Sequence, residues 1–176
     1  MNRKLKLEEL NRLSVEDFKK LKKYPIVVVL NNIRSLNNVG SFFRTCDALA
    51  IEKIILTGIT ATPPHKEIRK TALGATESVE WVYVKNCNAI VSEYKQSGYK
   101  AYAVEQTRNS ISLVNIQYNS EPVLLIFGNE VDGVEQQVID LCDNCIEIPQ
   151  FGTKHSFNVS VSAGVILWHF IHQIIK

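Results

Sequence analysis

After Tyr24-Pro25 the chain alternates between short apolar runs and longer stretches in which apolar residues recur at helical spacing. Such alternation favours a parallel sheet with helices on both faces, because parallel neighbours are joined by crossovers that are usually helices. The pattern predicts strands over residues 26–30, 53–56, 80–84, 101–105, 122–127 and 145–148. It predicts helices over residues 39–50, 87–96, 135–141 and 158–175. The stretch 60–76 is left as a long loop, which is usually functional in a compact domain.

The length of 176 residues and a hydrophobic fraction of 45% fit one domain that buries its own core. No apolar run follows the charged N-terminus, so neither a signal peptide nor a transit peptide is indicated. The longest apolar stretch, residues 159–175, is interrupted by Ser, His and Gln, which favours a buried helix over a membrane span. We therefore expect a cytoplasmic protein without a membrane partner.

The cysteines Cys46, Cys87, Cys142 and Cys145 are too few and too irregularly spaced for a disulfide framework. Cys142 and Cys145 form a CxxC, but it lies between a predicted helix and a predicted strand instead of opening a helix. No second Cys/His pair follows at zinc-finger spacing. The sequence indicates reduced cysteines and no metal site.

Residues 1–23 form a distinct basic segment, although the net charge of the whole chain is only +2. Its leucines and Phe18 recur at helical spacing, which predicts two short amphipathic helices, the second capped by Ser14. Two interpretations stay open. The lysines and arginines form either a solvated face or a cationic arm that touches nucleic acid.

Two loops rich in Gly and small polar residues follow the late predicted strands, over residues 126–134 and 146–160. Ligands of open α/β sheets bind at the carboxyl ends of the strands, and Gly lets main-chain groups approach a ligand closely. The two loops therefore predict a pocket built from backbone, for a small, polar and partly aromatic ligand.

A third polar segment, residues 31–44, follows the first predicted strand. Asn38 suits the N-cap of the next helix, Gly40 permits a close backbone approach, and Arg44 adds a charged fork, which together predict an anion site. An ordinary capped helix with an exposed Arg is the alternative. The chain has no G-x-G-x-x-G, and residues 152–156 have the wrong spacing for a P-loop, so hydride transfer and NTP hydrolysis are disfavoured.

Together these segments resemble the SpoU-type (TrmH-type) RNA 2'-O-ribose methyltransferases of the SPOUT superfamily. The resemblance consists of three ordered motifs: Asn38-Val39-Gly40 through Arg44; Leu125-Ile126-Phe127-Gly128-Asn129-Glu130 with Gly133; and Ile148-Pro149, Gly152 and Ser156-Phe157-Asn158-Val159-Ser160. It runs from about Tyr24 to the C-terminus, which divides the chain into a short basic helical extension, 1–23, and a methyltransferase domain, 24–176. Phe157 stands where the family usually has Leu, and the exchange keeps an apolar side chain.

The resemblance implies a knotted parallel-sheet SPOUT fold with a C-terminal trefoil knot, a homodimer, and transfer of a methyl group from S-adenosyl-L-methionine to a ribose 2'-hydroxyl of tRNA or rRNA. The residues implied to hold the cofactor are Phe127, Gly128, Asn129, Gly133, Ile148, Pro149, Gly152 and Phe157. The catalytic residues implied to surround the acceptor are Asn38, Arg44, Glu130, Ser156 and Asn158. The terminal helix is apolar around most of its circumference, which is consistent with a dimer.

Arg44 cannot easily act as the base, because a guanidinium is always protonated and has no acceptor lone pair. We expect Arg44 to grip the phosphate beside the target ribose, while that phosphate, water or Glu130 takes the proton. An ion pair between Glu130 and Arg44 is the alternative role for Glu130.

RNA is expected to meet a basic surface, with tRNA as the first candidate and rRNA as the second. The residues expected to bind it, besides the N-terminal lysines, are Arg34, Lys66, Arg69 and Lys70. A non-catalytic dimeric RNA-binding module that retains the cofactor pocket is the alternative function.

Overall fold

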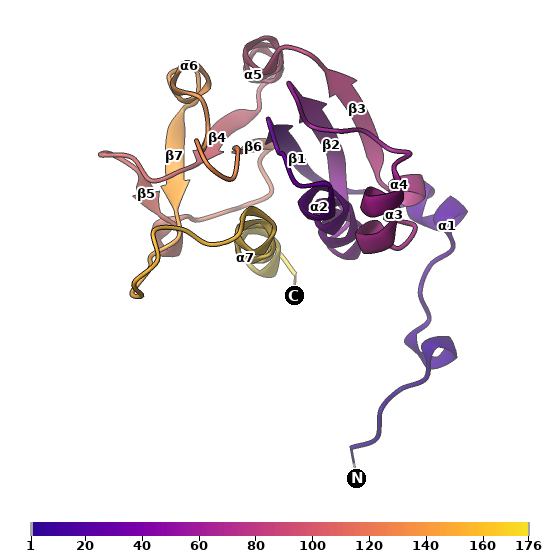
Figure 1. The fold of residues 1–176 in the computed structure, drawn as a ribbon. Coiled ribbons are helices and arrows are strands. Elements are labelled where there is room, and N and C mark those ends of the chain that lie inside the picture. Colours follow the sequence, from indigo (N-terminus) through magenta and orange to yellow (C-terminus); the bar gives the residue numbers. More distant parts are fainter. Residues whose placement is uncertain (1, 176) are drawn as a thin grey trace.

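The computed structural model describes residues 2–175, except for the side chain of Leu7. Met1 and Lys176, which the expected ranges 1–23 and 24–176 include, lie outside these residues. Within them the chain forms a parallel sheet in the order β3-β2-β1-β6-β4-β7-β5 (Figure 1). The strands are β1 (Tyr24–Asn31), β2 (Ile51–Thr57), β3 (Glu80–Val84), β4 (Lys100–Val104), β5 (Ile111–Ser112), β6 (Val123–Phe127) and β7 (Asn144–Glu147).

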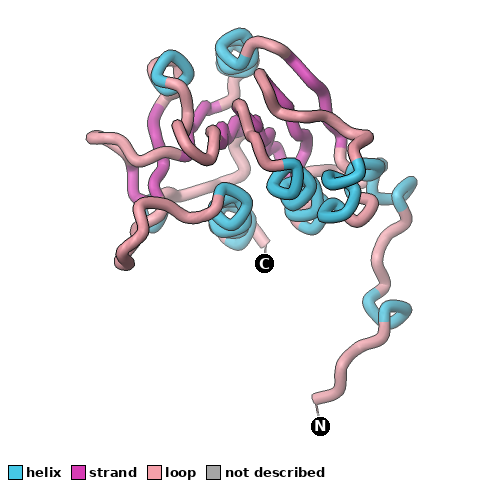
Figure 2. The backbone as a smooth tube through the Cα atoms, viewed as in Figure 1, coloured by secondary structure: helices cyan, strands magenta, loops and turns pink. Residues whose placement is uncertain are grey.

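Helices cover both faces of the sheet, as the alternating pattern predicts (Figure 2). On one face lie α2 (Leu36–Ala48), α3 (Lys66–Ala72), α4 (Ala75–Ser78) and α7 (Val159–His172). On the other face lie α5 (Cys87–Gln96) and α6 (Gln136–Ile139). A 3₁₀ turn, η2 (Leu113–Asn115), follows β5.

The N-terminal segment holds the two short helices that the sequence predicts. The first is a 3₁₀ turn, η1 (Leu7–Leu10), and the second is α1 (Val15–Lys20). Ser14 caps α1, since its Oγ accepts a hydrogen bond from the Asp17 N–H at 3.1 Å. Phe18 is buried and packs into the main core, while the residues before α1 extend away from the body (Figure 1).

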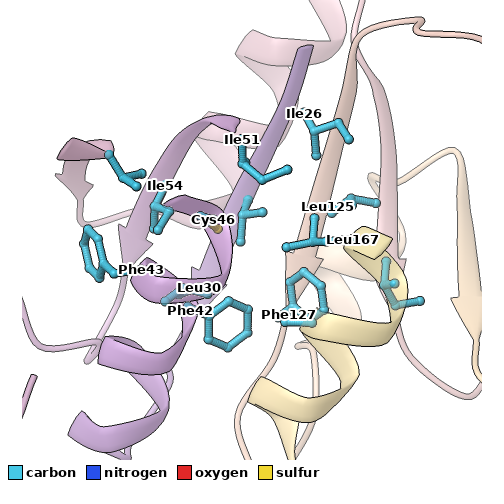
Figure 3. Close-up of a cluster of buried hydrophobic side chains, with 14 of the residues drawn as sticks. Ile26, Leu30, Phe42, Phe43, Cys46, Ile51, Ile54, Leu125, Phe127 and Leu167 are labelled. Carbon is cyan, nitrogen blue, oxygen red and sulfur yellow. The ribbon is translucent and has the colours of Figure 1, made fainter. Parts of the chain in front are cut away.

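The two central strands, β1 and β6, are almost wholly buried, because a parallel sheet between two helical layers has no solvated face. Alternate side chains of β1 enter two cores, with Val28 and Leu30 towards α2 and α7 and Val27 and Val29 towards α5 and α6. In the first core the ring of Phe42 meets that of Phe127 edge-on, with centroids 5.1 Å apart (Figure 3). The α2 side of the sheet is thereby fixed against the end of β6.

The predicted strands each correspond to a strand of the structure, with shifts of at most two residues at the ends. The unbroken loop predicted over residues 60–76 is wrong, because the segment contains α3 and the start of α4. His65 caps α3 by accepting the Glu67 N–H at Nδ1, 3.2 Å away. Helices this short carry little periodic signal and are stabilised mainly by packing. The strand β5 was not predicted, since two residues are too few to show alternation.

The start predicted for the helix over residues 39–50, with Asn38 as its N-cap, is also wrong. Helix α2 begins at Leu36, and its N-cap is Ser35, whose Oγ accepts from the Asn38 N–H at 3.3 Å. Asn38 is therefore inside the first turn and uses its side chain elsewhere. The close approach expected at Gly40 is confirmed, because a Cβ there would lie 2.3 Å from the Ile68 carbonyl oxygen of α3.

Candidate active site

A cavity of about 790 Å³ opens at the carboxyl-terminal edge of the sheet. Its walls come from three segments, which follow β4, β6 and β7 and end at the start of α7. The cavity is the pocket that the glycine-bearing loops predict. The lining residues predicted from the sequence are Phe127, Gly128, Asn129, Glu130, Gly133, Ile148, Ser156, Phe157 and Asn158.

Four of the predicted cofactor and catalytic residues do not line this cavity. Pro149 and Gly152 lie in the loop before α7, and a Cβ on Gly152 would meet no atom within 4 Å. Asn38 stands behind the cavity wall, where it bonds to two lining residues. Arg44 lies elsewhere on α2.

The loop after β6 is a tight hairpin. The backbones of Asn129 and Gly133 exchange two hydrogen bonds of 2.9 Å, and Asn129 Oδ1 accepts from the Val131 N–H at 2.8 Å. Gly133 has a φ of +69°, which favours glycine. A Cβ on Gly128 would lie 2.2 Å from the Gly133 carbonyl carbon. Gly128 is therefore required by the close passage of one backbone over the other, and Gly133 by its positive φ.

Glu130 points from this hairpin to the start of α2. Its carboxylate accepts from the backbone N–H groups of Arg34 and Ser35 and from Asn38 Nδ2, each at 2.9 Å. Burial on its own would raise the pKa of the Glu130 carboxyl, but these three hydrogen bonds outweigh it and lower the pKa below the ordinary value. Glu130 is thus ionised at neutral pH and stabilises the start of α2.

Because the folded pKa of Glu130 is depressed, its stabilising contribution is present above the unfolded pKa, near 4.5, and is lost as pH falls towards the folded pKa. We expect Glu130→Gln to reduce the free energy of unfolding by about 1 kcal/mol at pH 7, a modest value because the carboxylate is partly exposed. The difference from wild type should shrink below about pH 4. Urea unfolding at pH 7 and pH 3.5 measures it, and an equal difference at both values would contradict this assignment.

Asn38 links the first motif to the third. Its Oδ1 accepts from Asn158 Nδ2 at 3.2 Å and from Ser160 Oγ at 3.4 Å. Asn158 in turn caps α7, since its Oδ1 accepts from the Ser160 N–H at 2.9 Å and from the Val161 N–H at 3.4 Å. One polar network therefore runs from Glu130 through Asn38 to Asn158, and it joins the starts of α2 and α7 at the cavity wall.

Arg44 is exposed and lies in the third turn of α2, because the helix begins at Leu36. In a helix that began at residue 39, as predicted, it would lie in the second turn. Among the described residues its side chain makes no hydrogen bond and no ion pair, so the alternative pair with Glu130 is not formed. With 3.6 residues per turn, Arg44 lies opposite the buried Phe42, Phe43 and Cys46 side of the helix. It faces away from the sheet.

Three residues after β4 that line the cavity were not predicted as site residues, namely Glu105, Gln106 and Thr107. The rule that predicted the other two segments applies to them as well, because Glu105 ends the strand predicted over residues 101–105 and Gln106 and Thr107 directly follow it. They contain no glycine, however, and lie outside the recognised motifs. The charged lining side chains Glu105, Glu130, Asp132 and Glu147 give the cavity an acidic character.

The residues predicted to bind RNA are all exposed. Lys66 and Arg69 border a small hollow at the start of α3, together with Pro64 and His65. Arg34 lies in the turn before α2, where its backbone N–H bonds to Glu130. These basic residues therefore belong to the turn before α2 and to α3, and these two helices lie side by side (Figure 1).

The four cysteines are free. Burial raises the pKa of the Cys87 thiol to about 11 and that of the Cys142 thiol to about 12, which makes both poorly reactive at neutral pH. Within residues 2–175 no cluster of three or more His, Cys, Asp or Glu side chains is arranged to hold a metal ion. In the same part of the chain, no helix combines the length and the apolarity needed to cross a bilayer.

Comparison with known proteins gives a consistent family. The model of the SpoU rRNA Methylase family matches residues 25–168. A 23S rRNA (guanosine-2'-O-)-methyltransferase of Neisseria meningitidis is 30% identical, over 89% of this chain and 62% of its own length. A tRNA (guanosine(18)-2'-O)-methyltransferase of Aquifex aeolicus is 29% identical, over 84% of this chain and 69% of its own length. The solved structure of the A. aeolicus TrmH/SpoU tRNA modifying enzyme has a TM-score of 0.81 at 25% identity, covering 90% of this chain and 81% of that one.

Proposed function

This chain belongs to the SpoU rRNA Methylase family, and we propose that it transfers a methyl group from S-adenosyl-L-methionine to a ribose 2'-hydroxyl of RNA. The observation that carries the proposal is the network from Glu130 through Asn38 to Asn158, which joins all three motifs at one cavity. The chain spans 62% of the length of the N. meningitidis relative.

The cavity suits the proposed cofactor in size and in lining. Its volume of about 790 Å³ lies within the range of small-molecule sites. Phe127, Ile148 and Phe157 offer apolar contact for an adenine, and Gly128 brings main chain to the cavity wall. When bound, S-adenosyl-L-methionine supplies an electrophilic methyl group.

The remaining residues bind and orient the acceptor. Glu130 already accepts three hydrogen bonds and has a lowered pKa, which favours a positioning role over removal of the hydroxyl proton. Ser156 and Asn158 line the cavity and can donate or accept hydrogen bonds near the ribose. Arg44 grips the neighbouring phosphate and stabilises the developing alkoxide, while that phosphate or water takes the proton.

Incubation with tritiated S-adenosyl-L-methionine and bulk cellular RNA tests the proposal. A methyltransferase labels the RNA, whereas a binding module that merely retains the pocket takes up the cofactor and labels nothing. The module has no use for the complete network around Asn38, and the compared relatives are named as methyltransferases.

A homodimer is part of the proposal. Along α7 the exposed apolar residues Val161, Val165 and Trp168 recur at spacings of four and three, opposite the buried side of the helix. Because the buried sides of α7 and α2 face the sheet, this stripe points away from the sheet, as Arg44 does on α2. The two helices lie side by side (Figure 1). A second copy that covers the stripe therefore lies beside Arg44 and completes the acceptor site.

We expect Val165→Asp to weaken this dimer about 100-fold or more, because the substitution buries an unpaired carboxylate at the interface. The matched control is Val82→Asp on β3, since Val82 is 40% exposed and Val165 is 39% exposed. Sedimentation velocity measures both variants. A dimer that survives Val165→Asp, or a wild-type monomer, would refute this interface.

We also propose which RNA the protein acts on and where in the cell it does so. The named relatives act on tRNA or on rRNA, and we place tRNA first. The proposed contacts are Arg34, Lys66, Arg69, Lys70 and the basic extension, residues 1–23, ahead of the methyltransferase domain, residues 24–176. A cytoplasmic location fits such a substrate.

We also propose that the chain is knotted. Helix α7, which follows β7, packs against the connection between β5 and β6. The Tyr118 N–H donates to Gln173 Oε1 at 2.9 Å, His169 Nε2 lies 3.1 Å from the Ile116 carbonyl oxygen, and the Tyr118 ring packs on Phe170. These contacts support passage of the C-terminal segment through the loop that follows β4, which makes a trefoil.

A further inference from the structure

We propose that Glu105 and Gln106, directly after β4, are positioning residues that hold the two ligand loops in the conformation that binds the cofactor. Glu105 holds the loop after β6, and Gln106 holds the loop before α7. The inference rests on the proposed function and extends it to residues outside the three family motifs.

The Glu105 carboxylate lies against the Gly133 turn. Its Oε2 accepts from the Val134 N–H at 3.1 Å, and its Oε1 accepts from the Gln106 N–H at 2.8 Å. A Cβ on Gly133 would lie only 2.1 Å from Glu105 Oε2. The carboxylate therefore occupies the space that a side chain on Gly133 would need, and it fixes the far end of the hairpin.

The contact between Glu105 and the Gly133 turn also affects the position of the cavity wall. Gly128 packs beneath the same turn, since a Cβ on it would lie 2.3 Å from the Val134 nitrogen. Glu105, the Gly133–Val134 turn and Gly128 thus form three layers in contact, and Glu105 and Gly128 both line the cavity. Movement of Glu105 displaces the backbone that we assign to the cofactor, because close-packed layers transmit such shifts.

Gln106 acts on the other ligand loop. Its Nε2 donates to the His155 carbonyl oxygen at 2.7 Å. In the described part of the chain, this is the hydrogen bond that ties residues 149–157 to another segment. The loop is otherwise loosely held, and Phe151 is 97% exposed. Release of this bond frees the segment that carries Ser156 and Phe157.

Calorimetric titration with S-adenosyl-L-methionine tests the inference. Glu105→Gln keeps the shape but places an amide N–H against one of the two backbone N–H donors, so we expect cofactor affinity to fall about tenfold or more. Gln106→Glu cannot donate to His155, and we expect a loss of about threefold to tenfold. The control is Glu121→Gln, which removes an exposed carboxylate paired with Lys100.

The kinetic signature separates positioning from general damage to the fold. A positioning role predicts a raised KM for the cofactor, with kcat at saturating cofactor, KM for RNA and the melting temperature close to wild type. Unchanged cofactor affinity in Glu105→Gln overturns the inference, and so does an equal loss of kcat, RNA affinity and melting temperature. If the wild type itself binds no cofactor, the proposed function fails instead, so the two failures are distinguishable.

A double-mutant cycle tests the contact between Glu105 and Gly133 directly. Gly133→Ala should weaken cofactor binding strongly, both through its positive φ and through the clash with the carboxylate. In a Glu105→Ala background the clash is absent, so the same substitution should cost several-fold less. Strict additivity of the two effects would show that Glu105 does not support the turn.

Discussion

Gly128→Ala is expected to reduce affinity for S-adenosyl-L-methionine at least 100-fold and to lower the free energy of unfolding by about 1–3 kcal/mol. The added Cβ would lie 2.2 Å from the Gly133 carbonyl carbon and 2.3 Å from the Val134 nitrogen. These are backbone atoms, so no side chain can rotate to relieve the clash. The hairpin must move, and the cavity wall moves with it.

Gly152→Ala is the matched control for Gly128→Ala. Gly152 belongs to the third motif, yet a Cβ there would meet nothing within 4 Å, and we expect cofactor affinity within about twofold of wild type. Calorimetry and thermal unfolding measure both variants. Wild-type affinity in Gly128→Ala would show that the backbone beside Gly128 does not hold the cofactor.

Arg44→Ala is expected to slow methyl transfer at least 100-fold at saturating cofactor, because it removes the charge that we propose stabilises the developing alkoxide. Cofactor affinity should stay unchanged, since Arg44 does not line the cavity. Arg44→Lys keeps the charge but loses the bidentate fork, and we expect a loss of at least tenfold.

Single-turnover methylation measures both Arg44 variants, with Arg69→Ala as a control. Arg69 is exposed on α3 and is assigned to RNA binding alone, so its loss should weaken RNA affinity and leave the rate at saturating RNA unchanged. Full activity of Arg44→Lys would exclude the phosphate fork. Loss of cofactor binding in Arg44→Ala would place Arg44 in the cofactor site instead.

The alternating pattern was sufficient to predict the sheet, because buried parallel strands such as β1 and β6 are continuous apolar runs. It failed where an element depends on packing. Helix α3 is stabilised by the close contact of Ile68 with Gly40 on α2. These two residues are 28 positions apart in the sequence, so no local pattern reports the contact. Strand β5 exists because it pairs with β7, and its two residues carry no pattern of their own.

The parts of the candidate site that could be predicted are those that consist of glycines and short sequence motifs. Gly128, Gly133 and Asn158 were all found in this way, and each now has a structural reason in a close backbone approach, a positive φ or a helix cap. The partners of Glu130 were not predictable, because they depend on how the start of α2 lies against the hairpin after β6. Glu105 was missed because its contact with Gly133 leaves no local signal.

The strand order β3-β2-β1-β6-β4-β7-β5 could likewise not be predicted from the pattern of apolar residues. Strand β4 precedes β6 in the chain, yet in the sheet it lies between β6 and β7. This position brings the residues after β4 next to the loops that follow β6 and β7. The spacing of apolar residues does not indicate which strands are neighbours in the sheet. The resemblance to a known family implied the general fold, but not the contribution of Glu105 and Gln106.

The measurement closest to the central claim is nucleoside analysis of methylated RNA. RNA from source cells that lack this protein is incubated with the protein and with S-adenosyl-L-methionine that carries a deuterated methyl group, then digested and analysed by mass spectrometry. The account predicts deuterium in a 2'-O-methyl nucleoside, with the label reduced at least 100-fold in Arg44→Ala. Label on a base, or no label although calorimetry shows cofactor bound, would contradict it.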